Sequence, residues 1–473
     1  MERHLTLHRS SPIEHDKQAM DANLLIKNQR QFFNSNATKP IAFRIDRLRE
    51  FHSVLKKNEK LIYEAIYADY RKSEFDSFLT EFLVLYDDLK LALEKVSAWA
   101  SPKKVRTNLL NWPARSYILP EPLGVSLVIG AWNYPVQLSL APVVAAMTTG
   151  NTIVLKPSEL AAATSSALAK MINDTFDPNY FTVVEGGVPE TTALLDQKFD
   201  KIFFTGSTTV GKIVYQAAAK NLTPVTLELG GKSPAIFMED CDLDASIKRL
   251  VWAKFINAGQ TCIAPDYVLV HKAIEKTFLE KVRKEIVSSN FSISNGNYVQ
   301  IINEKNAARI LGMIDPAKVY YAGDATADNR TIPPTVMANV DFEDKIMSEE
   351  IFGPVLPVIA FTDVDEPIVK IKERPKPLSL YLFTKSGETK EKILREISFG
   401  GGCVNDALMH ISNGNLPFGG VGGSGVGRYH GEAGFSTFSH YKSVLDKPSW
   451  FEPGIKYYPH TSLKLKLLKW LAG

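Results

Sequence analysis

Residues 124–156 read GVSLVIGAWNYPVQLSLAPVVAAMTTGNTIVLK and contain one complete strand–helix–strand unit. The run GVSLVIG predicts a buried strand, the segment from Val136 to Met147 predicts a helix, and TIVLK predicts a second strand. Strands that alternate with helices in this way usually form a parallel sheet with helices on both faces. The unit therefore predicts an α/β fold with a doubly wound, mostly parallel sheet.

The same alternation continues beyond this unit. The runs FTVVEG, KIFFTG and PVTLELG predict further strands that are separated by helical stretches. After Gly231 a second alternation begins, with strands at PAIFM and YVLVH and helices at DASIKRLVWAKFI and AIEKTFLEKVRKEIV. The chain therefore predicts two α/β domains, and ligands are expected outside the carboxyl ends of their strands.

The segments before residue 124 follow other patterns. Residues 1–20 are predicted to form a loose leader, and the chain from about Ala42 to Trp99 is predicted to be helical. One apolar face of this helical region contains Leu48, Phe51, Leu55, Ile62 and Ile66. Around Pro102 to Pro122, the alternating run RSYILPEP predicts a hairpin set apart from the main body.

Bulk composition excludes several classes of protein. The chain has 473 residues, a formal net charge of +3 and three cysteines. So small a charge does not suggest nucleic-acid binding, and so few cysteines predict a reducing compartment without a disulfide framework. The start of the chain lacks the apolar core of a signal peptide, and no run of 18 apolar residues predicts a membrane-spanning helix. We therefore expect a cytoplasmic protein.

The last residues, TSLKLKLLKWLAG, interleave leucines with lysines. On a helical wheel, Leu463, Leu467 and Trp470 share one face, which Lys464 interrupts. This pattern predicts an imperfectly amphipathic tail. Two interpretations stay open, namely packing on the body or a partner subunit, and peripheral contact with a membrane surface.

The run FFTGSTTVGKIVY, residues 203–215, is typical of a phosphate-binding turn between a strand and a helix. Gly206 and Gly211 have the spacing of a P-loop, and Lys212 follows them. However, Ile213 stands where that loop needs a Ser or Thr hydroxyl to hold magnesium. The run therefore predicts a bound phosphate and disfavours a P-loop nucleoside triphosphatase.

Three polar residues stand at positions suited to chemistry. Cys262, in NAGQTCIAP, is either a nucleophile or an inert core thiol. Glu228 ends the strand in TLELGG, where it either faces the ligand crevice or caps a helix. Asn133 follows the strand GVSLVIG, and its side-chain amide either donates to a developing oxyanion or caps the next helix. Position alone leaves both interpretations open for each residue.

Two further motifs suit a nucleotide. In KPSE, Lys156 ends a strand and Glu159 follows three residues later, so both side chains fit ribose hydroxyls, with an ordinary solvated turn as the alternative. In SEEIFGPVLPV, Glu350 and Phe352 stand beside a Gly-Pro turn.

Taken together, these motifs resemble the aldehyde dehydrogenase superfamily from roughly Gln29 to Val444. The shared motifs, in the family's order, are WNYP, KPSE, FTGSTTVGK, LELGGKSP, GQTC, EEIFGPV and LPFGGVGGSGVG. The finer resemblance is to the class 3 and fatty aldehyde dehydrogenase branch, through GQTCIAPDYVLV and LPFGGVGGSGVGRYHGEAGFSTFSH. It implies an aldehyde dehydrogenase-like α/β fold with a Rossmann-type cofactor domain, a catalytic domain and a small β bridging element.

The resemblance also implies domain boundaries. They are an N-terminal helical part of the cofactor domain (1–101), a bridging hairpin (102–122), a dinucleotide-binding domain (123–229), a catalytic domain (230–429), a bridging strand (430–448) and the tail (449–473). Because the bridging elements join two subunits in the family, a homodimer is expected.

By the same resemblance, Cys262 attacks the aldehyde to give a thiohemiacetal. The side-chain amide of Asn133 and the backbone N–H of Cys262 hold the oxyanion. After oxidation a thioester remains, and Glu228 activates the water that hydrolyses it, which favours a free acid over transfer to coenzyme A. Glu350 is the alternative base, and no metal is implied.

The cofactor implied is NAD, since a carboxylate at Glu159 disfavours a 2′-phosphate, although the branch also tolerates NADP. The residues expected to bind it are Lys156, Glu159, Gly206, Ser207, Gly211, Glu350 and Phe352.

The branch prefers medium- and long-chain aliphatic or aromatic aldehydes. Tyr134, Trp252 and Ile411 are candidates to line an apolar substrate tunnel, with core packing as the alternative for each. A semialdehyde dehydrogenase of the same fold, which usually needs a cationic pocket, and a catalytically dead relative are the alternative functions.

Overall fold

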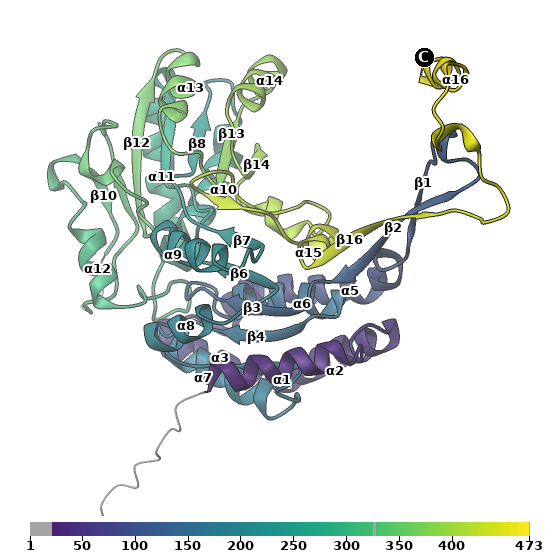
Figure 1. The fold of residues 1–473 in the computed structure, drawn as a ribbon. Helices are drawn as coiled ribbons and strands as arrows, with labels where there is room; N and C mark the ends of the chain where they lie inside the picture. Colours follow the sequence, from purple (N-terminus) through teal and green to yellow (C-terminus); the bar gives the residue numbers. More distant parts are fainter. Residues whose placement is uncertain (1–20, 325–327, 473) are drawn as a thin grey trace, which may run out of the picture.

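The structure is a computed structural model that describes residues 21–324 and 328–472. It contains two large sheets and one small sheet, as the two α/β alternations and the hairpin predict. Figure 1 shows the two large sheets within the body and the small sheet as an arm that leaves it. The predicted leader, residues 1–20, lies outside the described residues. The fold class is confirmed, whereas the domain boundaries stay predictions.

The first large sheet has six strands in the order β15-β7-β6-β3-β4-β5. All neighbouring pairs are parallel except β15 with β7. The strands are β3 (Val125–Ile129), β4 (Thr152–Lys156), β5 (Phe181–Val183), β6 (Lys201–Thr205), β7 (Val225–Glu228) and β15 (Gly425–Val426). Its helices are α1 (Ala22–Asn34), α6 (Gln137–Thr149), α7 (Ala162–Asn173), α8 (Val188–Leu195) and α9 (Thr208–Ala219).

The second large sheet has seven strands in the order β10-β11-β12-β9-β8-β13-β14, and only β10 pairs antiparallel. The strands are β8 (Pro234–Phe237), β9 (Tyr267–His271), β10 (Val319–Ala322), β11 (Thr335–Met337), β12 (Val355–Phe361), β13 (Ser379–Phe383) and β14 (Gly401–Val404). Its helices are α10 (Leu243–Phe255), α11 (Glu275–Ser289), α12 (Glu304–Leu311), α13 (Asp365–Lys372) and α14 (Gly387–Glu396).

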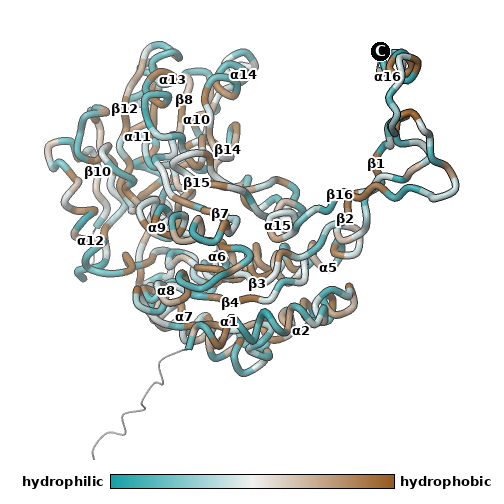
Figure 2. The backbone as a smooth tube through the Cα atoms, viewed as in Figure 1, coloured by the Kyte–Doolittle hydropathy of each residue, from teal (hydrophilic) through white to brown (hydrophobic). Residues whose placement is uncertain are grey.

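Burial explains why the central strands are continuous apolar runs. Every residue of β3 and β4 is buried, because helices cover both faces of the sheet. Figure 2 shows hydrophobic residues concentrated on such inner strands and hydrophilic residues on the outer helices. The parallel register places the carboxyl ends of β3, β4, β6 and β7 at one edge of the sheet. That edge is where the predicted ligand residues lie.

The N-terminal region is helical, as predicted, and its expected apolar face is fully buried. It comprises α2 (Ile41–Lys57), α3 (Glu59–Tyr70), α4 (Glu74–Ser77), a π-helix η1 (Phe78–Phe82) and α5 (Leu83–Trp99). The periodicity did not reveal α1 or the break at Arg71, where the backbone is left-handed with φ of 61°. None of the helices in the described part of the chain has the length and apolarity needed to cross a bilayer.

The predicted hairpin is present as β1 (Lys103–Val105) paired with β2 (Arg115–Pro122). The strand β16 (Ser439–Asp446), which follows α15 (Gly431–Thr437), pairs antiparallel with β2 and completes the arm. The tail forms the helix α16 (Ser462–Ala472) beyond the end of this arm. Its apolar side chains Leu463, Leu467 and Trp470 are exposed. The expectation that the tail packs on the body of its own chain is therefore wrong for this structure.

Candidate active site

The nucleophile candidate Cys262 lies on a loop whose backbone is unusual. The loop follows a short turn, Ile256–Gly259, in which Asn257, Ala258 and Gly259 all have positive φ, of 52°, 51° and 72°. A side chain at Gly259 would place its Cβ 2.3 Å from the carbonyl oxygen of Gly353, so only glycine fits there. Left-handed backbone at two non-glycine residues is costly and is concentrated at functional sites.

Hydrogen bonds join this loop to the segment that carries Asn133. The Asn133 amide Nδ2 donates to the carbonyl oxygen of Gln260 at 3.0 Å, two residues before Cys262. In the other direction, Asn257 Nδ2 donates to the carbonyl oxygen of Asn133 at 2.9 Å. The structure thus brings Asn133 and the Cys262 loop together. Because an amide has two N–H groups, Asn133 retains one for a further acceptor.

Another residue caps the helix that follows Asn133. The carboxylate of Glu81 accepts from the backbone N–H groups of Val136 and Gln137, at 2.8 and 3.4 Å. Glu81 is fully buried and belongs to the π-helix η1, a type of helix often found at functional sites. The interpretation of Asn133 as a helix cap is therefore not supported, since Glu81 fills that role.

Glu81 also begins a chain of polar contacts that reaches the Cys262 loop. Its second oxygen accepts from the ammonium of Lys72 at 3.0 Å, and both side chains are buried. That ammonium lies 4.5 Å from the ring centre of Tyr134. The Tyr134 hydroxyl lies 2.5 Å from Thr261 Oγ1, next to Cys262. Lys72 and Glu81 were not predicted from the sequence, because their pairing depends on the backbone path of the π-helix η1.

Glu228 ends β7 with its side chain 3% exposed. Neither carboxylate oxygen has a hydrogen-bond partner among the described residues, so it does not cap a helix. Burial raises the pKa of Glu228 well above its ordinary value. A buried carboxyl that makes no structural bond and has a perturbed pKa is a candidate for a proton-transfer role.

The thiol of Cys262 is a poor acid in this environment. Burial, followed by the negative charges of Glu350 and Glu228, raises its pKa to about 12. Glu350 and Glu228 therefore lie near enough to Cys262 for their charges to act on its thiol. A reaction at Cys262 needs a partner that removes the thiol proton.

Glu350 lies beside Gly230, two residues after Glu228. Burial, with a contribution from Asp266, raises the pKa of Glu350 to about 8, while the N–H of Gly231 opposes the shift. A Cβ added at Gly230 would lie only 1.9 Å from Glu350 Oε2, so the carboxylate occupies the space that a side chain at Gly230 would need. Phe352 has a positive φ of 48°, and its ring lies 5.2 Å from that of Trp132.

The edge of the first sheet fits a dinucleotide. Ser207 is the N-cap of α9, and its hydroxyl accepts from the N–H of Val210, so the first turn of α9 faces the loop after β6. A Cβ on Gly211 would lie 2.6 Å from the Leu229 side chain, so glycine lets this helix approach the sheet. Lys156, at the end of β4, donates to Glu159 at 3.3 Å. These groups offer N–H donors for a pyrophosphate and polar side chains for a ribose.

A cavity of about 350 Å³ leads to Cys262, and we refer to it as the catalytic cavity. Tyr134, Trp252 and Ile411 all line it, so the interpretation as tunnel residues is supported over core packing alone. Its other apolar walls include Leu79, Leu83, Val84, Leu138, Ile256, Met409 and Phe418. Asp87 is the one charged residue of the lining in the part of the chain that the structure describes, and no Lys, Arg or His contributes. Within residues 21–324 and 328–472, no group of acidic, His or Cys side chains is arranged to hold a metal ion.

Comparisons with known proteins place this geometry in context. The model of the aldehyde dehydrogenase family matches residues 13–444. The chain is 43% identical over 447 residues to 4,4'-diaponeurosporen-aldehyde dehydrogenase of Staphylococcus aureus, covering 93% of this chain and 97% of that protein. It is 43% identical to aldehyde dehydrogenase family 3 member A2 of Pongo abelii, covering 93% and 92%.

Two further comparisons concern assembly and fold. The dimeric NADP-preferring aldehyde dehydrogenase of Canis lupus familiaris is 40% identical, with 93% of this chain and 98% of that protein covered. A solved structure of Staphylococcus aureus AldH in a substrate-bound state superposes with a TM-score of 0.93 at 41% identity. That match covers 95% of this chain and 99% of the other.

Proposed function

This chain belongs to the aldehyde dehydrogenase family and oxidises aldehydes with NAD(P), and we propose that its substrates are medium- and long-chain aliphatic or aromatic aldehydes. The observation that carries this proposal is the apolar catalytic cavity that leads to Cys262. A semialdehyde with a free carboxylate would need a cation in this lining, and the described lining contains none. The cavity therefore favours an apolar substrate over the semialdehyde alternative.

We propose that Cys262 is the nucleophile. Its thiolate attacks the aldehyde carbon, and a thiohemiacetal forms as the carbonyl oxygen takes up negative charge. Asn133 supports this step, because its side-chain amide is held by the carbonyl oxygen of Gln260, its backbone carbonyl is held by Asn257, and the amide keeps a second N–H for the oxygen. The backbone N–H of Cys262 is the second proposed donor. Such fixed donors act on charge that develops only during the reaction.

We further propose that Glu228 is the residue that accepts and donates protons during the reaction. In its buried, unpaired state Glu228 has a raised pKa and is a carboxyl poised to exchange a proton with a water or thiol that enters the site. After oxidation, Glu228 in its carboxylate form takes a proton from water as that water attacks the thioester carbon, and the C–S bond breaks so that Cys262 leaves as the thiolate. Glu350, whose pKa is also raised, is the alternative base.

For the cofactor, we propose that Gly206, Ser207 and Gly211 admit the pyrophosphate to the start of α9. Lys156 and Glu159 then face the adenine ribose, and Glu350 and Phe352 lie at the nicotinamide end. Bound NAD(P) supplies the acceptor for the hydride that leaves the aldehyde carbon. The partly exposed carboxylate of Glu159 favours NAD over NADP, because it would repel a 2′-phosphate.

A homodimer that uses the arm is proposed as well. The arm carries exposed apolar side chains on strands and loops that contact little of their own chain, among them Leu109, Trp112 and Leu445. The exposed face of α16 lies beside it, and we propose that this helix contacts either the second subunit or a membrane surface. Light scattering with and without anionic vesicles tests both the homodimer and the contact made by α16. A monomer that does not bind the vesicles would refute both proposals.

The test of the proposed function is NAD(P)H formation with aldehydes from acetaldehyde to hexadecanal, with benzaldehyde included. The ratio kcat/KM should rise with chain length, and Cys262→Ala should abolish turnover with every substrate. A flat or falling profile would refute the proposed substrate class, although the enzyme would still be an aldehyde dehydrogenase.

A further inference from the structure

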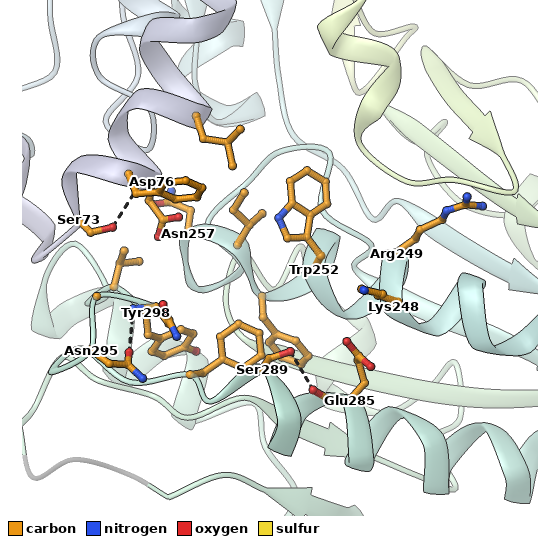
Figure 3. A pocket seen from close by; sticks show the side chains of 18 residues that line it. Ser73, Asp76, Lys248, Arg249, Trp252, Asn257, Glu285, Ser289, Asn295 and Tyr298 are labelled. Carbon is orange, nitrogen blue, oxygen red and sulfur yellow. Dashed lines mark hydrogen bonds between the residues drawn. The ribbon is translucent and has the colours of Figure 1, made fainter.

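A second cavity, which we call the side groove, lies between α4, α10 and the end of α11 (Figure 3). Its volume is about 710 Å³, twice that of the catalytic cavity. Aromatic side chains form much of its wall, including Phe75, Trp252, Phe255 and Phe291. In Figure 3, Ser289, Glu285 and Asn295 lie on the side of the groove opposite Trp252. Lys248 and Arg249 lie beside Trp252 on α10, and Asp76 lies on α4, so charged residues border an aromatic wall.

The side groove and the catalytic cavity adjoin each other. Leu79, Trp252 and Ile256 line both of them. Trp252 remains 40% exposed, so its ring stands at the surface between the two openings and is not sealed within the protein. A flexible chain that leaves the catalytic cavity therefore meets the apolar wall of the side groove as soon as it passes this ring.

We propose that the side groove binds the distal part of long aliphatic aldehydes while their reactive end lies at Cys262. This inference rests on the proposed function, because it assumes that long apolar aldehydes are the substrates. Phe75 supports it, since this large apolar side chain is 76% exposed and lines the groove without making a core contact that would explain it. The bound chain covers Phe75 and Trp252 and removes apolar surface from water.

The proposal has a kinetic signature. Each methylene that leaves water contributes about fourfold in affinity. If the chain beyond the catalytic cavity remained in water, kcat/KM would level off once that cavity is full. If the side groove holds the chain, kcat/KM continues to rise at greater lengths, and this later part of the rise depends on groove residues alone.

The experiment compares kcat/KM for hexanal, decanal and hexadecanal, below their solubility limits, in wild type and four variants. Phe75→Ser removes an apolar wall, Phe75→Leu restores an apolar side chain, and Ser289→Trp fills part of the groove. None of these positions lines the catalytic cavity. Tyr67→Ser is the matched control, because Tyr67 is an exposed aromatic residue on the neighbouring α3 that lines neither cavity.

Phe75→Ser and Ser289→Trp should lower kcat/KM for hexadecanal by about five- to twentyfold and leave hexanal unchanged. Phe75→Leu and Tyr67→Ser should behave like wild type. Unchanged hexadecanal kinetics in both groove variants, or an equal loss with hexanal, would overturn the role of the groove while the proposed function stands. A wild-type profile that does not rise with chain length would overturn the proposed substrate class and this inference together.

Discussion

The ammonium of Lys72 lies 3.0 Å from Glu81, and this buried ion pair supports the segment that carries Asn133. One carboxylate oxygen of Glu81 accepts from Lys72 and the other from the N–H of Val136. Lys72 in turn lies against the ring of Tyr134. The buried Lys72–Glu81 pair thus supports both the segment that carries Asn133 and, through Tyr134 and Thr261, the loop that carries Cys262.

A double-mutant cycle tests this support. Glu81→Gln keeps an acceptor for Val136 but leaves Lys72 as a buried charge without its partner, so it should lower the free energy of unfolding by about 3–5 kcal/mol. Adding Lys72→Met removes the stranded charge and should recover most of this loss. Chemical denaturation measures the free energy of unfolding of the wild type, the single variants and the double variant. If the double variant is as unstable as Glu81→Gln alone, the effect comes from lost packing and not from the ion pair.

Asn133→Ala should lower kcat by roughly a hundred- to a thousandfold, because one oxyanion donor is lost. Binding of the cofactor should change little, since Asn133 contacts the nucleophile loop and not the edge of the sheet near α9. Steady-state kinetics together with calorimetric titration of NAD separates the two effects. Equal losses in turnover and in cofactor affinity would indicate that the variant has disturbed the site as a whole.

Glu228→Gln should still form one equivalent of NADH in a rapid first turnover but should lose steady turnover. The reason is that oxidation precedes the step in which Glu228 is proposed to activate water. Rapid mixing with decanal, followed at the absorbance of NADH, measures the burst. A variant without the burst would show that Glu228 is needed earlier, and a variant with normal steady turnover would transfer the role of base to Glu350.

The sequence predicted most of the residues that meet in this site, because its signals are local. Glycines and the polar residues Asn133, Glu228 and Cys262 each follow a recognisable strand or turn. The supporting residues could not be predicted in this way. Lys72 and Glu81 meet because η1 is a π-helix, and one additional residue in a helical turn leaves no periodic signal. Likewise, α16 is exposed because it lies beyond the end of the arm, and the amphipathic pattern of the tail carries no information on that position.

The raised pKa of Glu350 predicts a dependence of stability on pH. Its pKa is about 8 in the folded protein, against an ordinary value of 4.5, so the folded state holds the proton more tightly than the unfolded state. The free energy of unfolding should therefore fall as the pH rises from about 4.5 to about 8. Glu350→Gln should remove part of this fall, on the order of 1–3 kcal/mol between pH 5 and pH 8.

Denaturant unfolding without cofactor at several pH values measures this effect, with Glu349→Gln as the control. Glu349 is the neighbouring residue, but it is exposed and pairs with Arg309. The control should reproduce the wild-type slope. If the free energy of unfolding changes with pH in the same way in wild type and Glu350→Gln, Glu350 titrates near its ordinary pKa.

Gly230 and Gly231 offer a matched pair of substitutions. A Cβ at Gly230 would lie 1.9 Å from Glu350 Oε2, whereas at Gly231 its nearest neighbour would be a backbone nitrogen at 3.4 Å. Gly230→Ala must therefore displace the Glu350 side chain, which is the flexible partner, and should raise the KM for NAD roughly tenfold with little loss of stability. Gly231→Ala should change the KM for NAD far less. Equal kinetics in the two variants would mean that the position of Glu350 is not what holds the nicotinamide end of the cofactor.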